Sequence, residues 1–382
     1  MRQGAARPRN RFDLAEVGGA FGDLGTLIPF VVAYVAVLKM DATAVLLPFG
    51  VALLVVGAVF RTPFPVQPMK AIGATALTQA AVSGGLTGDA VVAAGLVTGL
   101  IWLALAVSGL AARLARLVPR AALLGVVMGL GFAFMLEGVR MMAGQWLLSA
   151  VMLAVTLLML SRRWPAMLAL LAVGAAIALL RDPSLAARLG DQQAALRWPA
   201  FAWPGLSASD LWTGALLLAL PQLPLTFGNA LVAITAENNR LFPDRPIDER
   251  RVALSTGLMN LLASAGGGVP MCHGAGGMAG HVRFGARTGG AAIMLGAALV
   301  VLALFFGDAI GLLFELVPAP VLGVILFLAG VELALGSRDP EAEKTDRFVL
   351  LATAGIATWN AGAAVLFGIA AHHAVRAGWL RP

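Results

Sequence analysis

The sequence predicts an all-α polytopic membrane protein built from two inverted repeats. Three observations lead to this fold class: an apolar composition, long uninterrupted apolar windows, and short motifs that recur in the same order in both halves. Of 382 residues, 59% are hydrophobic and 12% are charged, with a mean hydropathy of +0.87. An ordinary soluble domain carries roughly 25% charged residues, so a soluble protein is excluded.

The apolar residues gather into windows that are long enough to cross most or all of a bilayer as helices, roughly 15–25 residues each. These windows are 44–60, 90–110, 121–136, 146–160, 165–180 and 289–306. They are continuously apolar and rich in Ala, Leu and Gly, whereas the strands of a membrane β-barrel alternate between apolar and polar residues. A membrane β-barrel is therefore not expected. The N-terminal arginines are followed by Asp13, Glu16 and Asp23, so no cleavable signal peptide is expected.

The distribution of basic residues predicts the topology. With a cytoplasmic N-terminus and fourteen segments, 21 of the 27 Lys and Arg residues face the cytoplasm, five lie outside, and Lys70 remains in the membrane. This bias is the one that the positive-inside rule describes. We therefore expect a multi-pass protein of the cytoplasmic (inner) membrane with both termini cytoplasmic. The topology then accounts for the net charge of +7, and no nucleic-acid partner is expected.

The two halves of the chain, 1–180 and 210–382, are joined by a predicted external linker, 181–209, and share motifs. Phe21-Gly22-Asp23-Leu24 corresponds to Phe227-Gly228-Asn229-Ala230, and Val66-Gln67-Pro68-Met69 corresponds to Val269-Pro270-Met271. Two further pairs follow in the same order, which indicates an internal duplication. Seven segments per half is an odd number, so the second copy enters from the opposite side, as in many secondary transporters.

The third segment of each half is short, polar and interrupted by proline, at residues 63–70 and 266–274. Each is expected to form a short strand followed by a half-helix, with Pro68 and Pro270 in the first helical turn. In an inverted repeat the two helix N-termini face each other. Their free N–H groups and positive dipole ends would form an anion site near the middle of the membrane.

Several polar residues of these segments are candidates for that site. Lys70 places a charge in the membrane at a cost of roughly 2.5–3.5 kcal/mol, so it should line a cavity, pair with Asp23 or reach the interface. Cys272 and His273 offer a small polarizable lining and a ring N–H, but too few ligands for zinc. We expect no metal and no cofactor, and we interpret His281 as an interfacial histidine.

The first and eighth segments flank this site. Pro29, Pro221 and Pro224 interrupt helical hydrogen bonding, which is tolerated in a membrane where the freed groups meet protein or water. Asn229 corresponds to Asp23 of the first half and has donors for an oxyanion. Simple interhelical hydrogen bonding by Asn229 and Thr226 remains an equal alternative.

Three motif blocks resemble the signatures of the molybdate transporter family, a branch of the sulfate permease superfamily. These blocks are residues 21–26, residues 64–71, and residues 270–277 with their continuation through 284–289. The similarity covers the chain from about Phe12 to Gly378. It implies the seven-plus-seven fold of the uracil permease type, with core segments in 12–110 and 210–313 and gate segments in 117–180 and 316–378. Because the chain stops at Pro382, no C-terminal regulatory domain is expected. A homodimer is possible on this resemblance.

The resemblance also implies which residues bind the substrate. On the two half-helices and their flanks these are Gln67, Met69, Lys70, Ala71, Thr226, Asn229, Cys272, His273, Gly274 and Ala275. Asp23 is expected to act in coupling, because a nearby dianion favours the neutral acid and links binding to protonation.

The expected function is therefore secondary active import of a tetrahedral oxyanion, molybdate, as a proton symporter. Sulfate, a dicarboxylate, a nucleobase and an anion channel remain alternatives. A nucleobase site would offer intramembrane Glu where this chain has Lys70, and a channel would have a continuous pore. An enzyme is not expected, because the segments lack a nucleophile elbow or a zinc helix motif.

Overall fold

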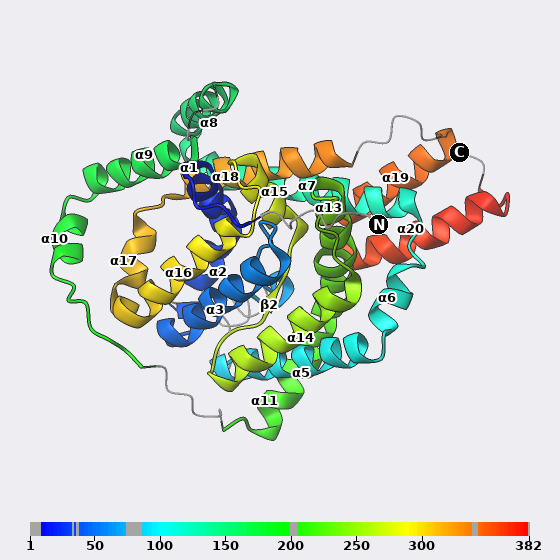
Figure 1. Ribbon diagram of the computed structural model, residues 1–382, viewed down its shortest axis with the longest axis horizontal. Coiled ribbons are helices and arrows are strands. Elements are labelled where there is room, and N and C mark those ends of the chain that lie inside the picture. The colour runs from blue at the N-terminus through cyan, green and yellow to red at the C-terminus, as the bar shows by residue number, and fades with distance from the viewer. Residues whose placement is uncertain are drawn as a thin grey trace, which may run out of the picture.

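The structure, a computed structural model, is almost entirely helical (Figure 1). It describes residues 9–32, 34–35, 38–73, 86–162, 164, 166–198, 205–337 and 343–380. Two strands of two residues each, β1 (Gln67–Pro68) and β2 (Met271–Cys272), form one antiparallel sheet within these ranges. The predicted all-α fold class is confirmed.

The helices of the first half begin at local start signals. The side chains of Asp13, Asp41 and Thr87 accept hydrogen bonds from backbone N–H groups at the starts of α1, α3 and α5. In order, the elements are α1 (Leu14–Ala20), the 3₁₀ turn η1 (Phe21–Asp23), α2 (Leu24–Val32), α3 (Ala42–Phe60), α5 (Gly88–Val107), α6 (Leu110–Ala115), α7 (Arg120–Met142), η3 (Ala143–Gln145), α8 (Trp146–Ser161) and α9 (Ala166–Arg181).

The second half contains a long helix with two π-helical parts, η4 and η5. After α10 (Ser184–Gly190), which lies in the predicted linker, the order is α11 (Ala208–Thr213), η4 (Gly214–Ala219), α12 (Leu220–Leu225), η5 (Thr226–Ala233), α13 (Ile234–Leu241), α14 (Glu249–Ala265), α15 (Ala275–Arg283), α16 (Gly290–Phe305), η6 (Gly307–Ala309), α17 (Ile310–Glu315), α18 (Ala319–Gly336), α19 (Lys344–Ala357) and α20 (Ala361–Arg376).

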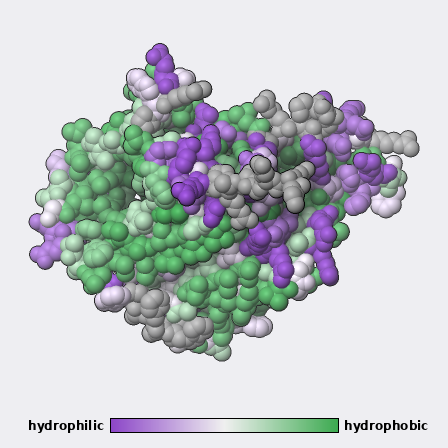
Figure 2. All heavy atoms as spheres, viewed as in Figure 1, coloured by the Kyte–Doolittle hydropathy of each residue, from purple (hydrophilic) through white to green (hydrophobic). Residues whose placement is uncertain are grey.

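Helices long and apolar enough to cross a membrane occur throughout the described ranges. Three spans qualify outright, at Ala42–Phe60, Gly88–Val107 and Arg120–Ser161, and two bent pairs, α9 with α10 and α16 with 307–315, qualify if each pair is one span. Figure 2 shows a broad apolar surface on one face, with polar side chains gathered mainly at its upper edge and right side. The protein is a multi-pass membrane protein; the count of fourteen segments and the orientation remain predictions.

Helices from the two halves pack against each other in pairs. α3 packs on α16, α5 on α14, and α7 on α18. In the last pair the backbones approach closely, because a Cβ at Gly138 would lie 2.7 Å from the Gly323 carbonyl oxygen and the reverse contact has the same length. Small residues at such crossings are typical of membrane helix packing. The mutual pairing agrees with two repeats of related structure.

The described part of the predicted linker 181–209 packs against η6 and α17 of the second half; residues 199–204 lie outside the described ranges. Arg188 pairs with Asp182 at 2.6 Å and with Glu315 at 3.1 Å. Arg197 pairs with Asp308 at 2.5 Å. These exposed ion pairs hold the linker against η6 and α17.

The positions of Pro68 and Pro270 correct one expectation. Neither lies in a helical turn: Pro68 is in β1 opposite Met271, and Pro270 directly precedes β2. The helices start later, at Lys70 and Ala275. Pairing with the opposite repeat extends the backbone through both prolines, and a two-stranded sheet tolerates proline because each strand has a free edge.

Candidate functional site

The two-stranded sheet joins the starts of both half-helices at the centre of the molecule. Gln67 lies opposite Cys272, and the Met69 amide donates to the Pro270 carbonyl oxygen at 3.0 Å. The side chain of Asn260, on α14, bonds both backbone groups of Met271, at 2.6 and 2.8 Å. The first half-helix covers 70–73 of the described residues, and the second is α15.

Asp23 is buried in η1 and belongs to a polar cluster with Thr26 and Gln67. Its Oδ1 accepts hydrogen bonds from the Thr26 hydroxyl and, at 2.6 Å, from Gln67 Nε2. The same Gln67 nitrogen donates to Thr26 Oγ1 at 2.8 Å. The other amide atom, Gln67 Oε1, is buried and has no partner among the described residues. It faces the second half-helix, since a Cβ on Gly274 would overlap it.

Side chains of α12 and η5 accept hydrogen bonds from N–H groups at the starts of both half-helices. Gln222 Oε1 accepts from Ala71 N at 2.8 Å and from Ile72 N at 3.4 Å. Asn229 Oδ1 accepts from Ala275 N at 3.3 Å. The donors that would bind an anion at a helix start are therefore held by neutral amide oxygens.

The helix that carries these amides explains their common direction. Gln222 Nε2 donates to Thr226 Oγ1 at 2.9 Å, one turn further along. Gln222, Thr226 and Asn229 are spaced by four and three residues and therefore share one face. η4 and η5 flank the positions of Pro221 and Pro224. Wide π turns of this kind occur often at functional sites.

Lys70 and Phe134 lie in contact at the first half-helix. The Lys70 ammonium lies 3.8 Å from the centre of the Phe134 ring, a cation–π arrangement. Phe134, on α7, is 7% exposed, and a Cβ on Gly276 would overlap its ring edge. The ring therefore contacts the starts of both half-helices. Lys70 and Asp23 form no salt bridge within the described ranges.

His273 is held by hydrogen bonds on both ring nitrogens. Nδ1 donates to the Pro65 carbonyl oxygen at 2.8 Å, so Nε2 accepts from the Ser255 hydroxyl at 3.0 Å. The ring also packs edge-on against Phe64, with centroids 4.9 Å apart. Cys272 and Met69 are buried in the apolar core. A contact of these three side chains with substrate remains a prediction.

The interfacial interpretation of His281 is wrong, because its side chain is fully buried. η1 crosses α15 closely: a Cβ on Gly22 would overlap the Gly280 carbonyl oxygen. This crossing encloses the imidazole, whose Nδ1 donates to the Gly19 carbonyl oxygen at 2.7 Å. Its Nε2 has no partner among the described residues.

Sequence reasoning missed Gln222 and Phe134. Gln222 had a usable signal, since it is a polar residue beside two prolines in an apolar segment. Phe134 had none, because it is one apolar residue in an apolar helix. In the described part of the chain, no cluster of three or more His, Cys, Asp or Glu residues is placed to hold a metal ion.

Comparison with known sequences gives consistent matches. A family described as "Molybdate transporter of MFS superfamily" matches residues 15–134 and 214–333, one stretch in each half. Molybdate transporter 1 of Arabidopsis thaliana is 32% identical, with 89% of this chain and 83% of that protein covered. Molybdate transporter 2 of the same plant is 31% identical, with 93% and 85% covered.

Comparison with solved structures shows the same fold. The transmembrane domain of the cyanobacterial bicarbonate transporter BicA has a TM-score of 0.57 at 16% identity, covering 93% of this chain and 98% of that one. SLC26A9 has a TM-score of 0.62 at 13% identity, covering 96% and 65%.

Proposed function

Because the chain belongs to the molybdate transporter family, we propose that it is a secondary active transporter that imports molybdate. The family consists of transporters of anions, and the chain is not an enzyme. We also propose that the protein acts in the cytoplasmic membrane as a homodimer, with both termini in the cytoplasm.

The observation that carries this proposal is the convergence of two half-helix starts beside Lys70. The N–H groups of Ala71 and Ala275 point at exchangeable amide oxygens, not at carboxylates. A dianion would form stronger, charge-assisted bonds with the same donors. Molybdate would therefore displace Gln222 and Asn229 and draw the Lys70 ammonium away from the Phe134 ring.

The cluster of Asp23 and Gln67 supports proton coupling. While Asp23 is ionised, Gln67 must donate to it, which leaves the Gln67 carbonyl oxygen facing Gly274. An acceptor at that place repels an oxyanion. Once Asp23 is protonated, its O–H can donate to Gln67 Oε1, so the amide rotates and presents its NH₂ group to the site. Protonation and anion binding thus favour each other.

A carrier is favoured over an anion channel by the position of Phe134. A channel needs a continuous pore with weak sites in series. The buried Phe134 ring instead contacts the starts of both half-helices, at Lys70 and Gly276, where a pore would need open space. Sulfate is the second candidate substrate, because it has the same charge and tetrahedral shape.

A binding titration tests the proposed substrate. Purified protein in lipid nanodiscs would be titrated with molybdate, tungstate, sulfate and uracil by calorimetry. We expect molybdate and tungstate to bind most tightly, sulfate more weakly, and uracil not at all. Binding of uracil without binding of any oxyanion would disprove the proposal.

A further inference from the structure

We propose that the groove between α3 and α14 is a specific site for an anionic phospholipid, with one acyl chain along the groove and the phosphate at the arginines of its end. The groove lies on the outside of the helix bundle, and it meets the candidate anion site at Ser255, whose hydroxyl bonds His273. This inference does not depend on the transported substrate.

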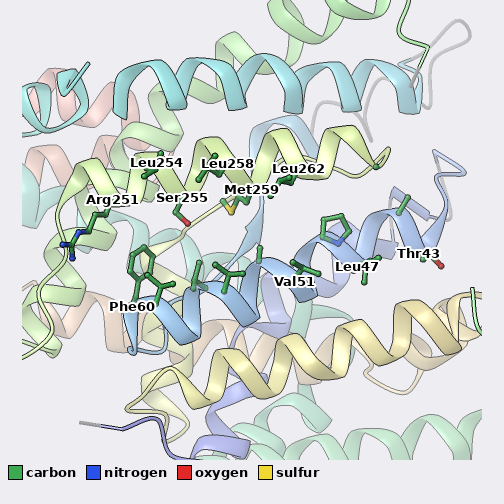
Figure 3. A pocket seen from close by; sticks show the side chains of 17 residues that line it. Thr43, Leu47, Val51, Phe60, Arg251, Leu254, Ser255, Leu258, Met259 and Leu262 are labelled. Carbon is green, nitrogen blue, oxygen red and sulfur yellow. The ribbon is translucent and has the colours of Figure 1, made fainter. Parts of the chain in front are cut away.

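The groove is apolar along its length (Figure 3). It has a volume of about 660 Å³. Val51, Val55 and Val59 line it from α3, and Leu254, Leu258 and Leu262 line it from α14, each set at intervals of four residues. All six side chains are more than a third exposed, the most exposed being Leu262 at 70%. Two facing apolar stripes leave room for a chain of methylene groups between them.

The length of the groove fits an acyl chain better than a small apolar molecule. Its lining runs from Thr43 to Phe60 on α3. At 1.5 Å per residue this is roughly 25 Å, which exceeds one leaflet of about 15 Å, half of the hydrocarbon core. A chain lying in it would be shielded on two sides.

A polar pocket of about 470 Å³ continues the groove at one end, sharing Val59, Phe60 and Arg251 with it. Its charged lining consists of Arg61, Arg245, Arg251, Asp244 and Asp248. Arg251 pairs with Asp248 at 3.4 Å, but the described residues contain no salt bridge for Arg61 or Arg245. The pocket therefore offers two guanidinium groups without a directly bonded carboxylate.

Local structure holds these two arginines in place. Arg61 ends α3 with a left-handed φ of 60°. Arg245 donates to the Arg61 carbonyl oxygen and, at 3.4 Å, to that of Arg287. The charges of Arg61 and Arg245 repel each other, Asp244 attracts Arg245, and a bound phosphate would add charge-assisted bonds to both guanidinium groups. Basic pockets beside membrane helices recognise lipid phosphates in this way.

Native mass spectrometry with phosphatidylglycerol and phosphatidylcholine of equal chain length tests the site. We expect the full-length protein to retain phosphatidylglycerol preferentially, and the double variant Arg61→Asn/Arg245→Gln to lose roughly tenfold in that affinity. Asn suits the left-handed backbone at residue 61. Arg113→Gln, an exposed arginine of α6, is the matched control and should retain the lipid.

Two further measurements distinguish a lipid site from a site that binds phosphate alone. Leu258→Trp fills the groove without altering charge and should also weaken phosphatidylglycerol binding, while inorganic phosphate should not displace the lipid. Equal retention of both lipids by the unmodified protein would overturn the proposal. So would displacement by millimolar phosphate, or unchanged binding by both groove variants in folded protein.

Discussion

The Lys70 ammonium lies over the face of the Phe134 ring, 3.8 Å from its centre. This contact joins the first half-helix to α7 and gives the lysine a partner other than a carboxylate. A cation–π contact is worth about 0.5–2 kcal/mol, less than the charge-assisted bonds that a dianion offers. It is therefore suited to be exchanged for substrate.

Phe134→Leu should tighten oxyanion binding by about threefold to tenfold, because Lys70 no longer has to leave the ring. Calorimetric titration with molybdate measures the change. Phe132→Leu, on the same helix and 41% exposed, is the control and should bind as the parent does. Weaker binding by a folded Phe134→Leu protein would mean that the ring helps to hold the anion.

Lys70→Met should weaken molybdate binding by more than about tenfold, since a hydrogen bond to a charged group is worth about 1.5–3 kcal/mol. Lys70→Arg keeps the charge but should recover only part of the affinity, because a planar guanidinium does not fit where a compact ammonium lies. Equal affinity of the Met variant and the parent would assign the lysine a structural role.

Gly274→Ala should lower both thermal stability and anion affinity. The added Cβ overlaps Gln67 Oε1 and forces that side chain from its bonds with Asp23 and Thr26, each worth about 0.5–1.5 kcal/mol. The matched control is Gly355→Ala in α19, where a Cβ meets nothing within 4 Å. A melting curve and a titration of each variant test this; a Gly274→Ala protein with parental values would contradict the proposed position of Gln67.

Asp23→Asn should bind the oxyanion yet lose most of the pH dependence of uptake. The parent should transport faster as the outside is acidified from pH 8 to 5, because protonated Asp23 lets Gln67 donate to substrate. Asn at this position mimics the neutral acid. Uptake of labelled molybdate into proteoliposomes measures both profiles, with the exposed Asp89→Asn as control. Parental pH dependence in Asp23→Asn would remove Asp23 from coupling.

The topology predicts that a reporter fused after Arg197 lies outside and one fused at the C-terminus lies in the cytoplasm. Paired alkaline phosphatase and fluorescent protein fusions check both positions. A cytoplasmic signal after Arg197 would refute both the segment count and the inverted relation of the two half-helices.

Much of the fold was predictable because it depends on local pattern. The windows 44–60, 90–110 and 289–306 correspond to α3, α5 and α16, since continuous apolar runs must satisfy their backbone groups as helices in a membrane. The repeated Val-Gln-Pro-Met and Val-Pro-Met motifs likewise predicted a short strand before each half-helix, and the two strands pair with each other.

The sequence by itself thus determined the class of fold, and it predicted two repeats and most of the polar residues that gather beside the two strands. Only the tertiary structure decided which of these residues touch. His273 bonds to Pro65 and Ser255, Lys70 lies on Phe134, and Gln222 covers the first half-helix. Each contact joins segments far apart in the chain, so it depends on where helices cross and how closely glycines let them approach. Local composition carries no information about that geometry.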